Sequence, residues 1–98
     1  MKTIKEINNI LSHSKKEIVE KYKLKKLGIF GSYVRGEQTE ESDIDILVEF
    51  EEDYKTFDNY MDLKFYFEDL FSTNVDLLIE SAIKPRLRHI ILNEVKYA

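Results

Sequence analysis

Cysteine is absent from this 98-residue sequence, which also has only one proline and three glycines. Without cysteine, the chain can form neither disulfide bonds nor thiolate metal sites. It also lacks a long apolar run, and it is charged from Lys2 onward. These two features predict that the chain has no signal peptide and no membrane span. We therefore expect a cytoplasmic protein.

Basic residues are in the minority, with 15 Lys and Arg against 19 Asp and Glu, which gives a net charge of -4. The isoelectric point is near 5.2. This balance argues against direct nucleic-acid binding, because proteins that bind a phosphate backbone are usually basic. It is compatible with a basic protein partner. The length predicts a single domain, residues 1–98, with one modest core.

A glycine turn follows a short apolar run, residues 27–30, that predicts a buried strand. Gly31 lets the backbone turn sharply and approach a ligand closely. Ser32 is expected to cap a short helix and, with nearby backbone N–H groups, to face an anion. Arg35 lies about one helical turn further and could reach the same anion. Gly36 is placed to end the helix. Taken alone, Gly-Ser is also a common structural turn.

A second predicted strand, residues 43–50, carries two carboxylates on one face. Alternate side chains of a strand share a face, so one set points into a core. That set is Ile44, Ile46, Val48 and Phe50. Asp43 and Asp45 then point the other way, roughly 6–7 Å apart. Aspartate is unfavourable in strands, so this pair suggests a functional role.

A third acid, Asp76, lies in another short apolar strand, residues 74–79. If the two strands are neighbours, Asp76 lies about 4.8 Å from the first carboxylate strand. Like charges about 4 Å apart repel by about 4 kcal/mol at an effective dielectric of 20. Mg²⁺ would relieve this repulsion, because it binds a few carboxylates together with substrate phosphates. Asp76 could instead be a strand-edge acid in water, and Glu49 either a minor metal ligand or a solvated residue.

The N-terminal residues 1–26 predict helix, because apolar residues recur at helical spacing. Thr3-x-x-Glu6 is a capping-box pattern, and Ser14-x-x-Glu17 is a second one. We therefore expect two consecutive helices, with a break at Ser12 to Ser14.

A further helix is predicted over residues 55–71, where the aromatic residues exceed one stripe and could face the core, a partner or an adenine ring. A last helix is expected after Ser81 as its cap, with Pro85 in its first turn. Its predicted apolar face consists of Leu87, Ile90, Ile91 and Val95. The alternation of helices and strands predicts an α/β fold with a small mixed sheet, helices mainly on one face and the carboxylates on the open face.

The motif as a whole resembles the nucleotidyltransferase superfamily related to DNA polymerase β. It consists of Gly31-Ser32, ten residues, Asp43-x-Asp45, and then Asp76 on a later strand. The segments GSYVRGE and SDIDILVEF are similar to those of the minimal nucleotidyltransferase (MNT) antitoxins, which are encoded beside toxins of the HEPN ribonuclease class. The resemblance covers nearly the whole chain and implies a nucleotidyltransferase fold.

This resemblance implies an enzyme that uses ATP and two Mg²⁺ ions and transfers AMP to a tyrosine hydroxyl of a partner HEPN toxin. Asp43 and Asp45 would hold both metals. Asp76 would complete the second metal site and favour a deprotonated acceptor hydroxyl.

The other half of the motif would bind the phosphates of ATP. Gly31 and Ser32 would bind the β- and γ-phosphates, and Arg35 would neutralise phosphate charge.

Two other functions stay open. The chain could be a nucleotidyltransferase subunit that acts on a small molecule or tRNA, although its small size and acidity disfavour this. It could also be a purely binding antitoxin that masks its toxin without chemistry, which the intact set of three acids disfavours.

Overall fold

A mixed four-stranded sheet is the centre of the structure, a computed structural model that describes residues 2–98. Its strands are β1 (Leu24–Phe30), β2 (Ile44–Phe50), β3 (Val75–Ile79) and β4 (Lys96–Tyr97), in the order β3-β2-β1-β4. The pairs β1–β2 and β1–β4 are antiparallel, whereas β2–β3 is parallel. The predicted mixed α/β sheet is thus confirmed, and β4 is an edge strand that the sequence pattern did not reveal.

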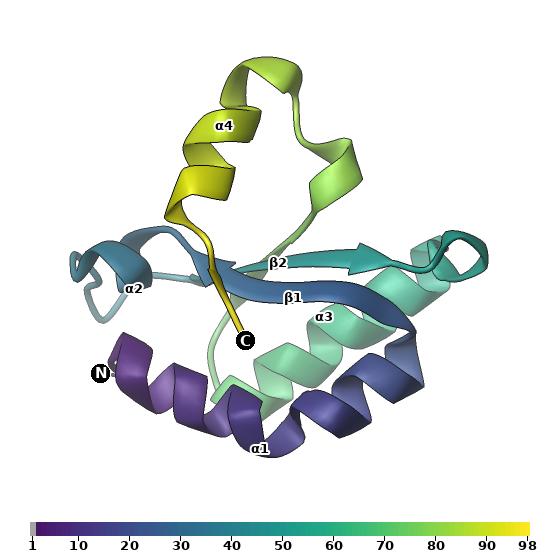
Figure 1. Ribbon diagram of the computed structural model, residues 1–98. Coiled ribbons are helices and arrows are strands. Elements are labelled where there is room, and N and C mark those ends of the chain that lie inside the picture. Colours follow the sequence, from purple (N-terminus) through teal and green to yellow (C-terminus); the bar gives the residue numbers. More distant parts are fainter. Residues whose placement is uncertain (1) are drawn as a thin grey trace.

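Two long helices, α1 (Ile4–Tyr22) and α3 (Phe57–Phe71), cover one face of the sheet (Figure 1). The core lies between these helices and β2, whose apolar set is almost completely buried. Those side chains are Ile44, Ile46, Val48 and Phe50. The predicted alternation along β2 is therefore confirmed, and the carboxylates point to the opposite face.

The prediction of two N-terminal helices is wrong, because α1 is continuous through residues 12–14. The Ser12 hydroxyl donates to the Asn8 carbonyl at 2.8 Å, and His13 Nδ1 lies 2.7 Å from the Asn9 carbonyl. These polar side chains thus bond to the carbonyl one turn back, within the helix. Ser14 does not cap a new helix.

The ends of α1 are set by a cap and by the next strand. The Thr3 hydroxyl accepts a hydrogen bond from the Glu6 backbone N–H at 3.2 Å, which confirms the first predicted cap. The helix ends at Lys23, whose φ of 56° is left-handed, so β1 begins at Leu24 rather than after Lys26. Met1 was part of the predicted helix and lies outside the described residues.

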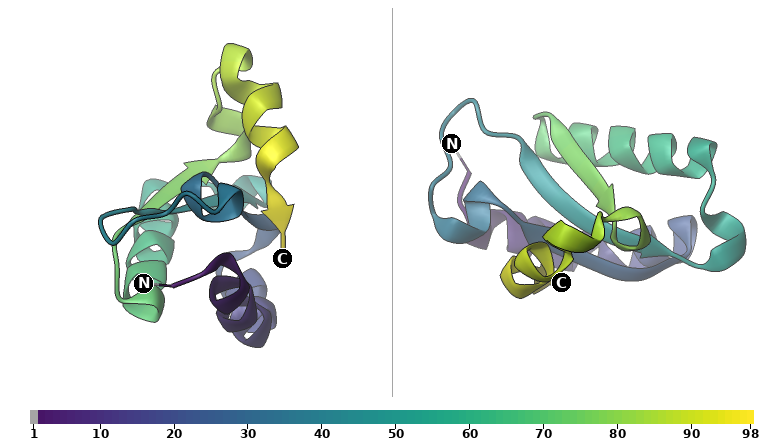
Figure 2. Two further views of the ribbon diagram at one scale, coloured as in Figure 1. Left: turned by 90° about the vertical axis from the view of Figure 1, so that its left-hand side faces the viewer. Right: turned by 90° about the horizontal axis from the view of Figure 1, so that it is seen from above.

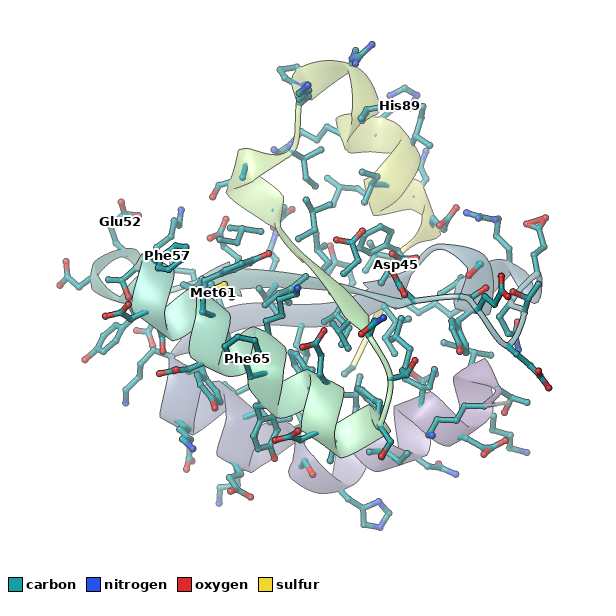
Figure 3. All side chains as sticks on the ribbon, turned by 180° about the vertical axis from the view of Figure 1, so that it is seen from behind. Asp45, Glu52, Phe57, Met61, Phe65 and His89 are labelled. Atoms are coloured by element: carbon teal, nitrogen blue, oxygen red, sulfur yellow. The ribbon has the colours of Figure 1, made fainter. Side chains whose placement is uncertain are left out.

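The start of α3 is close to its prediction. A short 3-10 turn, η1 (Glu52–Tyr54), precedes it, and the Thr56 hydroxyl caps it by accepting from the Asn59 N–H at 3.1 Å. Phe67 is fully buried, while Phe57 is exposed, so the aromatic residues divide between core and surface. Figure 3 labels Phe57 on this helix.

The last helix, α4 (Pro85–Glu94), stands on the face of the sheet that α1 and α3 leave open (Figures 1 and 2). Pro85 occupies its first turn as predicted, but Ser81 is not its cap, because Ser81 lies in a separate 3-10 turn, η2 (Glu80–Ala82).

The predicted apolar face of α4 does not enter the core, because no side chain of this helix is buried. Leu87 is 40% exposed and Ile90 is 54% exposed. The helix rises away from the sheet instead of lying across it, so its apolar side does not join the core (Figure 2). Within residues 2–98, no helix is both long and apolar enough to cross a membrane.

Candidate active site

The parallel register of β2 and β3 places Asp45 directly opposite Asp76. Asp43 directly precedes β2 and shares a face with Asp45, because two residues along a strand return to the same side. Figure 3 shows Asp45 on the side of the sheet that carries α4. The structure thus brings the three predicted carboxylates to one region of the open face.

Electrostatic repulsion is evident at Asp45. Partial burial raises the pKa of this carboxyl from 3.8, and the negative charges of Asp76 and Asp43 raise it further, to about 6. The positive charge of Arg35 acts in the opposite direction. A cation placed among these carboxylates would therefore stabilise their ionised forms.

The donor set fits Mg²⁺ that arrives together with a nucleotide. Within residues 2–98, no three histidine, aspartate or glutamate side chains converge as a ready-made metal site. Mg²⁺ in phosphoryl-transfer sites is commonly held by one or two carboxylates, with phosphate oxygens and water as its other ligands. Asp43, Asp45 and Asp76 supply carboxylate oxygens of this kind, and substrate phosphates would complete the coordination.

The glycine turn adjoins the carboxylates because the antiparallel register pairs Phe30 with Asp45. Gly31 has φ of 80° and ψ of -154°, a conformation that residues with a side chain rarely adopt. A Cβ at this position would collide with the Asp45 carboxylate. The close approach of the two halves of the motif therefore requires glycine here.

The short helix α2 (Ser32–Arg35) begins one residue earlier than a serine cap would allow. Gly31 occupies the cap position, and Ser32 is the first helical residue, so the predicted capping role of Ser32 is wrong. Gly36 ends the helix as predicted, with φ of 72° and its N–H directed to the Ser32 and Tyr33 carbonyls.

Arg35 lies on the same turn, but acidic side chains already bind it. Its Nε donates to Glu37 at 2.6 Å, and its Nη1 lies 2.9 and 2.8 Å from the two carboxylate oxygens of Glu94. Glu94 also accepts a hydrogen bond from the Gly31 N–H. Sequence reasoning missed Glu94, because no local pattern connects the end of α4 with a turn 63 residues earlier.

Glu49 is not a solvated residue, because its side chain is largely buried. Its carboxylate accepts from the Ser81 N–H at 2.9 Å and forms an ion pair with Lys55 at 3.3 Å. Burial alone would raise the pKa of Glu49, but the hydrogen bonds from Ser81 and Lys55 hold it below its ordinary value. Glu49 therefore anchors η2 and the start of α3 to the sheet.

An apolar cavity of about 380 Å³ lies beside β3. Its lining includes Phe57 and Tyr60 of α3 and Ile79 of β3. The Tyr60 hydroxyl donates to the Leu77 carbonyl at 2.6 Å. Burial raises the pKa of Tyr60, and the negative charge of Asp76 raises it further.

Comparison with known proteins agrees with this geometry. The sequence profile described as "Nucleotidyltransferase domain" matches residues 11–98, which include every residue of the motif. The chain belongs to the nucleotidyltransferase family. Protein adenylyltransferase MntA of Thermococcus cleftensis is 43% identical to this nucleotidyltransferase over 99% of this chain and 97% of its own.

Several solved structures share this fold. A minimal nucleotidyltransferase superposes with a TM-score of 0.75 at 33% identity, over 90% of this chain and 92% of that chain. A chain of a toxin–antitoxin complex with AMP-PNP superposes with a TM-score of 0.71 at 24% identity, over 87% of this chain and 69% of that chain. A chain of the complex of tri-AMPylated Shewanella oneidensis HEPN toxin with MNT antitoxin superposes with a TM-score of 0.65 at 20% identity, over 91% of this chain and 69% of that chain.

Proposed function

We propose that this nucleotidyltransferase acts in the cytoplasm as an antitoxin that transfers AMP from ATP to a tyrosine hydroxyl of a HEPN-class toxin. The observation that carries the proposal is the pairing of Asp45 with Asp76 beside the Gly31 turn. The family membership and the similarity to a protein adenylyltransferase support it. The structural neighbours that hold AMP-PNP or an AMPylated toxin share this fold.

The carboxylates have distinct roles in the proposed reaction. Asp43 and Asp45 would hold two Mg²⁺ ions, and Asp76 would add a carboxylate ligand to the second. Bound Mg²⁺ supplies positive charge that stabilises the attacking and leaving oxygens. Asp76 pairs with Asp45 in the strand register. In the proposed reaction it favours loss of the proton from the acceptor tyrosine.

The glycine turn positions the leaving group. The Gly31 N–H and the Ser32 hydroxyl bind the β- and γ-phosphates, and Arg35 neutralises part of their charge. The tyrosine oxygen forms a bond to the α-phosphorus as the bond from that phosphorus to the bridging oxygen breaks. The products are pyrophosphate and AMP-tyrosine, and the phenolic proton passes to Asp76 or to solvent.

The double variant Asp43→Asn with Asp45→Asn tests the reaction, because it removes metal-binding charge with little change in shape. The cognate toxin would be co-expressed with each form and weighed intact. We expect toxin from wild-type cells to be heavier by whole AMP units, and toxin from the double variant to have its unmodified mass. A control with Asp62→Asn and Asp69→Asn, two exposed acids of α3, makes the same charge change away from the site.

Protection of the cells separates catalysis from masking. An antitoxin that only binds would protect equally well as the double variant. The catalytic proposal would be overturned if the double variant protected fully and wild-type toxin carried no added mass. Modification of a small molecule or tRNA instead of the toxin would favour the other transferase function.

A further inference from the structure

The end of α4 places a carboxylate on the groups that we assign to the phosphates of ATP. Glu94, the last residue of α4, accepts from the Gly31 N–H, and both of its oxygens lie within 2.9 Å of Arg35 Nη1. The side chain is only 21% exposed, so it is held in the turn and not displayed to solvent. One carboxylate thus joins two donors that are 4 residues apart in sequence.

A carboxylate and a phosphate can accept hydrogen bonds from the same donors. Each presents negatively charged oxygens to a backbone N–H and to a guanidinium, and such charge-assisted bonds are the strong ones. The Gly31 N–H has one hydrogen and cannot serve Glu94 and a phosphate oxygen fully at once. We propose that Glu94 occupies the phosphate position in the absence of nucleotide and competes with ATP for it. This inference rests on the proposed function, and it adds a regulatory contact within the same site.

The weak anchoring of α4 makes displacement of Glu94 feasible. No side chain of the helix is buried, so its outward movement exposes little core. Besides Glu94, the hydrogen bonds that hold it include Arg88 Nη1 to the Glu80 carbonyl at 3.2 Å and the short pairing of β4 with β1.

The charges around Asp45 favour the same exchange. Glu94 is among the negative groups that raise the pKa of Asp45, after the larger effects of burial, Asp76 and Asp43. When a Mg²⁺-nucleotide binds, the departure of Glu94 removes one like charge from the carboxylates that receive the cation.

The affinity for Mg²⁺·AMP-PNP, measured by titration calorimetry, tests this competition in three forms of the full chain. They are wild type, Glu94→Gln and Glu37→Gln. Each substitution removes one negative charge from Arg35, but only Glu94 also binds the Gly31 N–H. We expect Glu94→Gln to bind the nucleotide about tenfold more tightly, which corresponds to about 1.4 kcal/mol. Glu37→Gln is expected to stay within about twofold of wild type.

The outcomes separate the two proposals. If wild type binds the nucleotide but Glu94→Gln binds equally or more weakly, Glu94 supports the site and the competition is overturned, while the proposed function stands. If neither wild type nor Glu94→Gln binds the nucleotide, the proposed function fails, and the proposed competition fails with it. An equal increase in nucleotide affinity in Glu37→Gln would show a general effect of charge and would also overturn the proposed role of Glu94.

A measurement on wild type alone covers the case in which Glu94→Gln fails to fold. Amide hydrogen exchange would be followed along the chain with and without Mg²⁺·AMP-PNP. We expect exchange in α4 to become faster as the nucleotide displaces Glu94, while exchange at the Gly31 turn becomes slower. Slower exchange in α4 on nucleotide binding would overturn the inference.

Discussion

Asp45 stands where the requirements of stability and of nucleotide binding oppose each other. It is partly buried against the Gly31 turn, and it faces the negative charges of Asp76 and Asp43. Its pKa of about 6 means that the metal-free folded protein favours the protonated carboxyl more than the unfolded chain does. A side chain chosen for stability alone would be neutral here, whereas the metal site that we propose needs the ionised carboxylate.

The pKa of Asp45 predicts that Asp45→Asn stabilises the metal-free protein by an amount that depends on pH. The folded pKa is about 6 and the ordinary value 3.8, so the folded state binds the proton more tightly. The contribution of Asp45 to the free energy of unfolding is therefore fully present at low pH and is lost as pH rises through about 6. We expect Asp45→Asn to raise the melting temperature at neutral pH and to have little effect near pH ~4.

Thermal melting in the presence of a chelator checks this prediction. Glu40→Gln, a change at an exposed loop carboxylate, controls for the loss of one negative charge. A lower melting temperature for Asp45→Asn at neutral pH, or the same gain at both pH values, would contradict the assigned cause.

At the scale of elements, α1 and α4 have similar apolar periodicity but different surroundings. In α1 the apolar side is buried against the sheet and α3, with Ile18 only 1% exposed. In α4 the corresponding side remains in contact with solvent. Since burial against other elements supplies most of the stability of a helix in a protein, the two helices contribute very differently to the fold.

A matched pair of substitutions, Ile18→Ala and Ile90→Ala, measures this difference. We expect Ile18→Ala to lower the free energy of unfolding by about 2–5 kcal/mol, because it leaves a cavity in the core. Ile90→Ala should change it by less than about 0.5 kcal/mol, because the side chain is largely in water already. Urea unfolding curves give both values. A cost for Ile90→Ala close to that for Ile18→Ala would show that α4 packs into the core in solution.

At the scale of the whole molecule, one face of the sheet packs the core and the other carries the candidate active site. One face is covered by α1 and α3 and holds the core (Figure 1). The other face holds Asp45 (Figure 3), which the strand register pairs with Asp76. The chain as a whole also carries a net charge of -4. On the open face, the negative charges of Asp76 and Asp43 raise the pKa of Asp45, and the positive charge of Arg35 offsets them only in part.

Binding of Mg²⁺ with ATP should therefore stabilise the whole domain. A ligand that binds only the folded state raises its stability by mass action, by about 2.7 kcal/mol at a concentration 100 times the dissociation constant. We expect a higher melting temperature with Mg²⁺ and ATP together than with either alone, and no such gain in the Asp43→Asn, Asp45→Asn double variant. Sodium chloride at matched ionic strength separates binding from screening. An unchanged melting temperature at saturating Mg²⁺ and ATP would exclude the proposed nucleotide site.

Local patterns determined much of this protein from the sequence alone. The alternation along β2 predicted which side chains enter the core and that Asp43 and Asp45 face away from it, because side-chain direction in a strand has a period of two. The turn at Gly31 and the end of α2 at Gly36 were also predicted, since glycine tolerates positive φ. Each of these features depends on residues only a few positions apart.

Only the tertiary structure decided how distant segments meet. The strand order places Asp76 beside Asp45, and the return of the chain through α4 and β4 brings Glu94 to Gly31 from 63 residues away. The exposure of the apolar side of α4 has the same origin, because an amphipathic pattern predicts an apolar stripe but not whether another element covers it. Contacts between distant residues follow from sheet order and packing, which no short stretch of sequence contains.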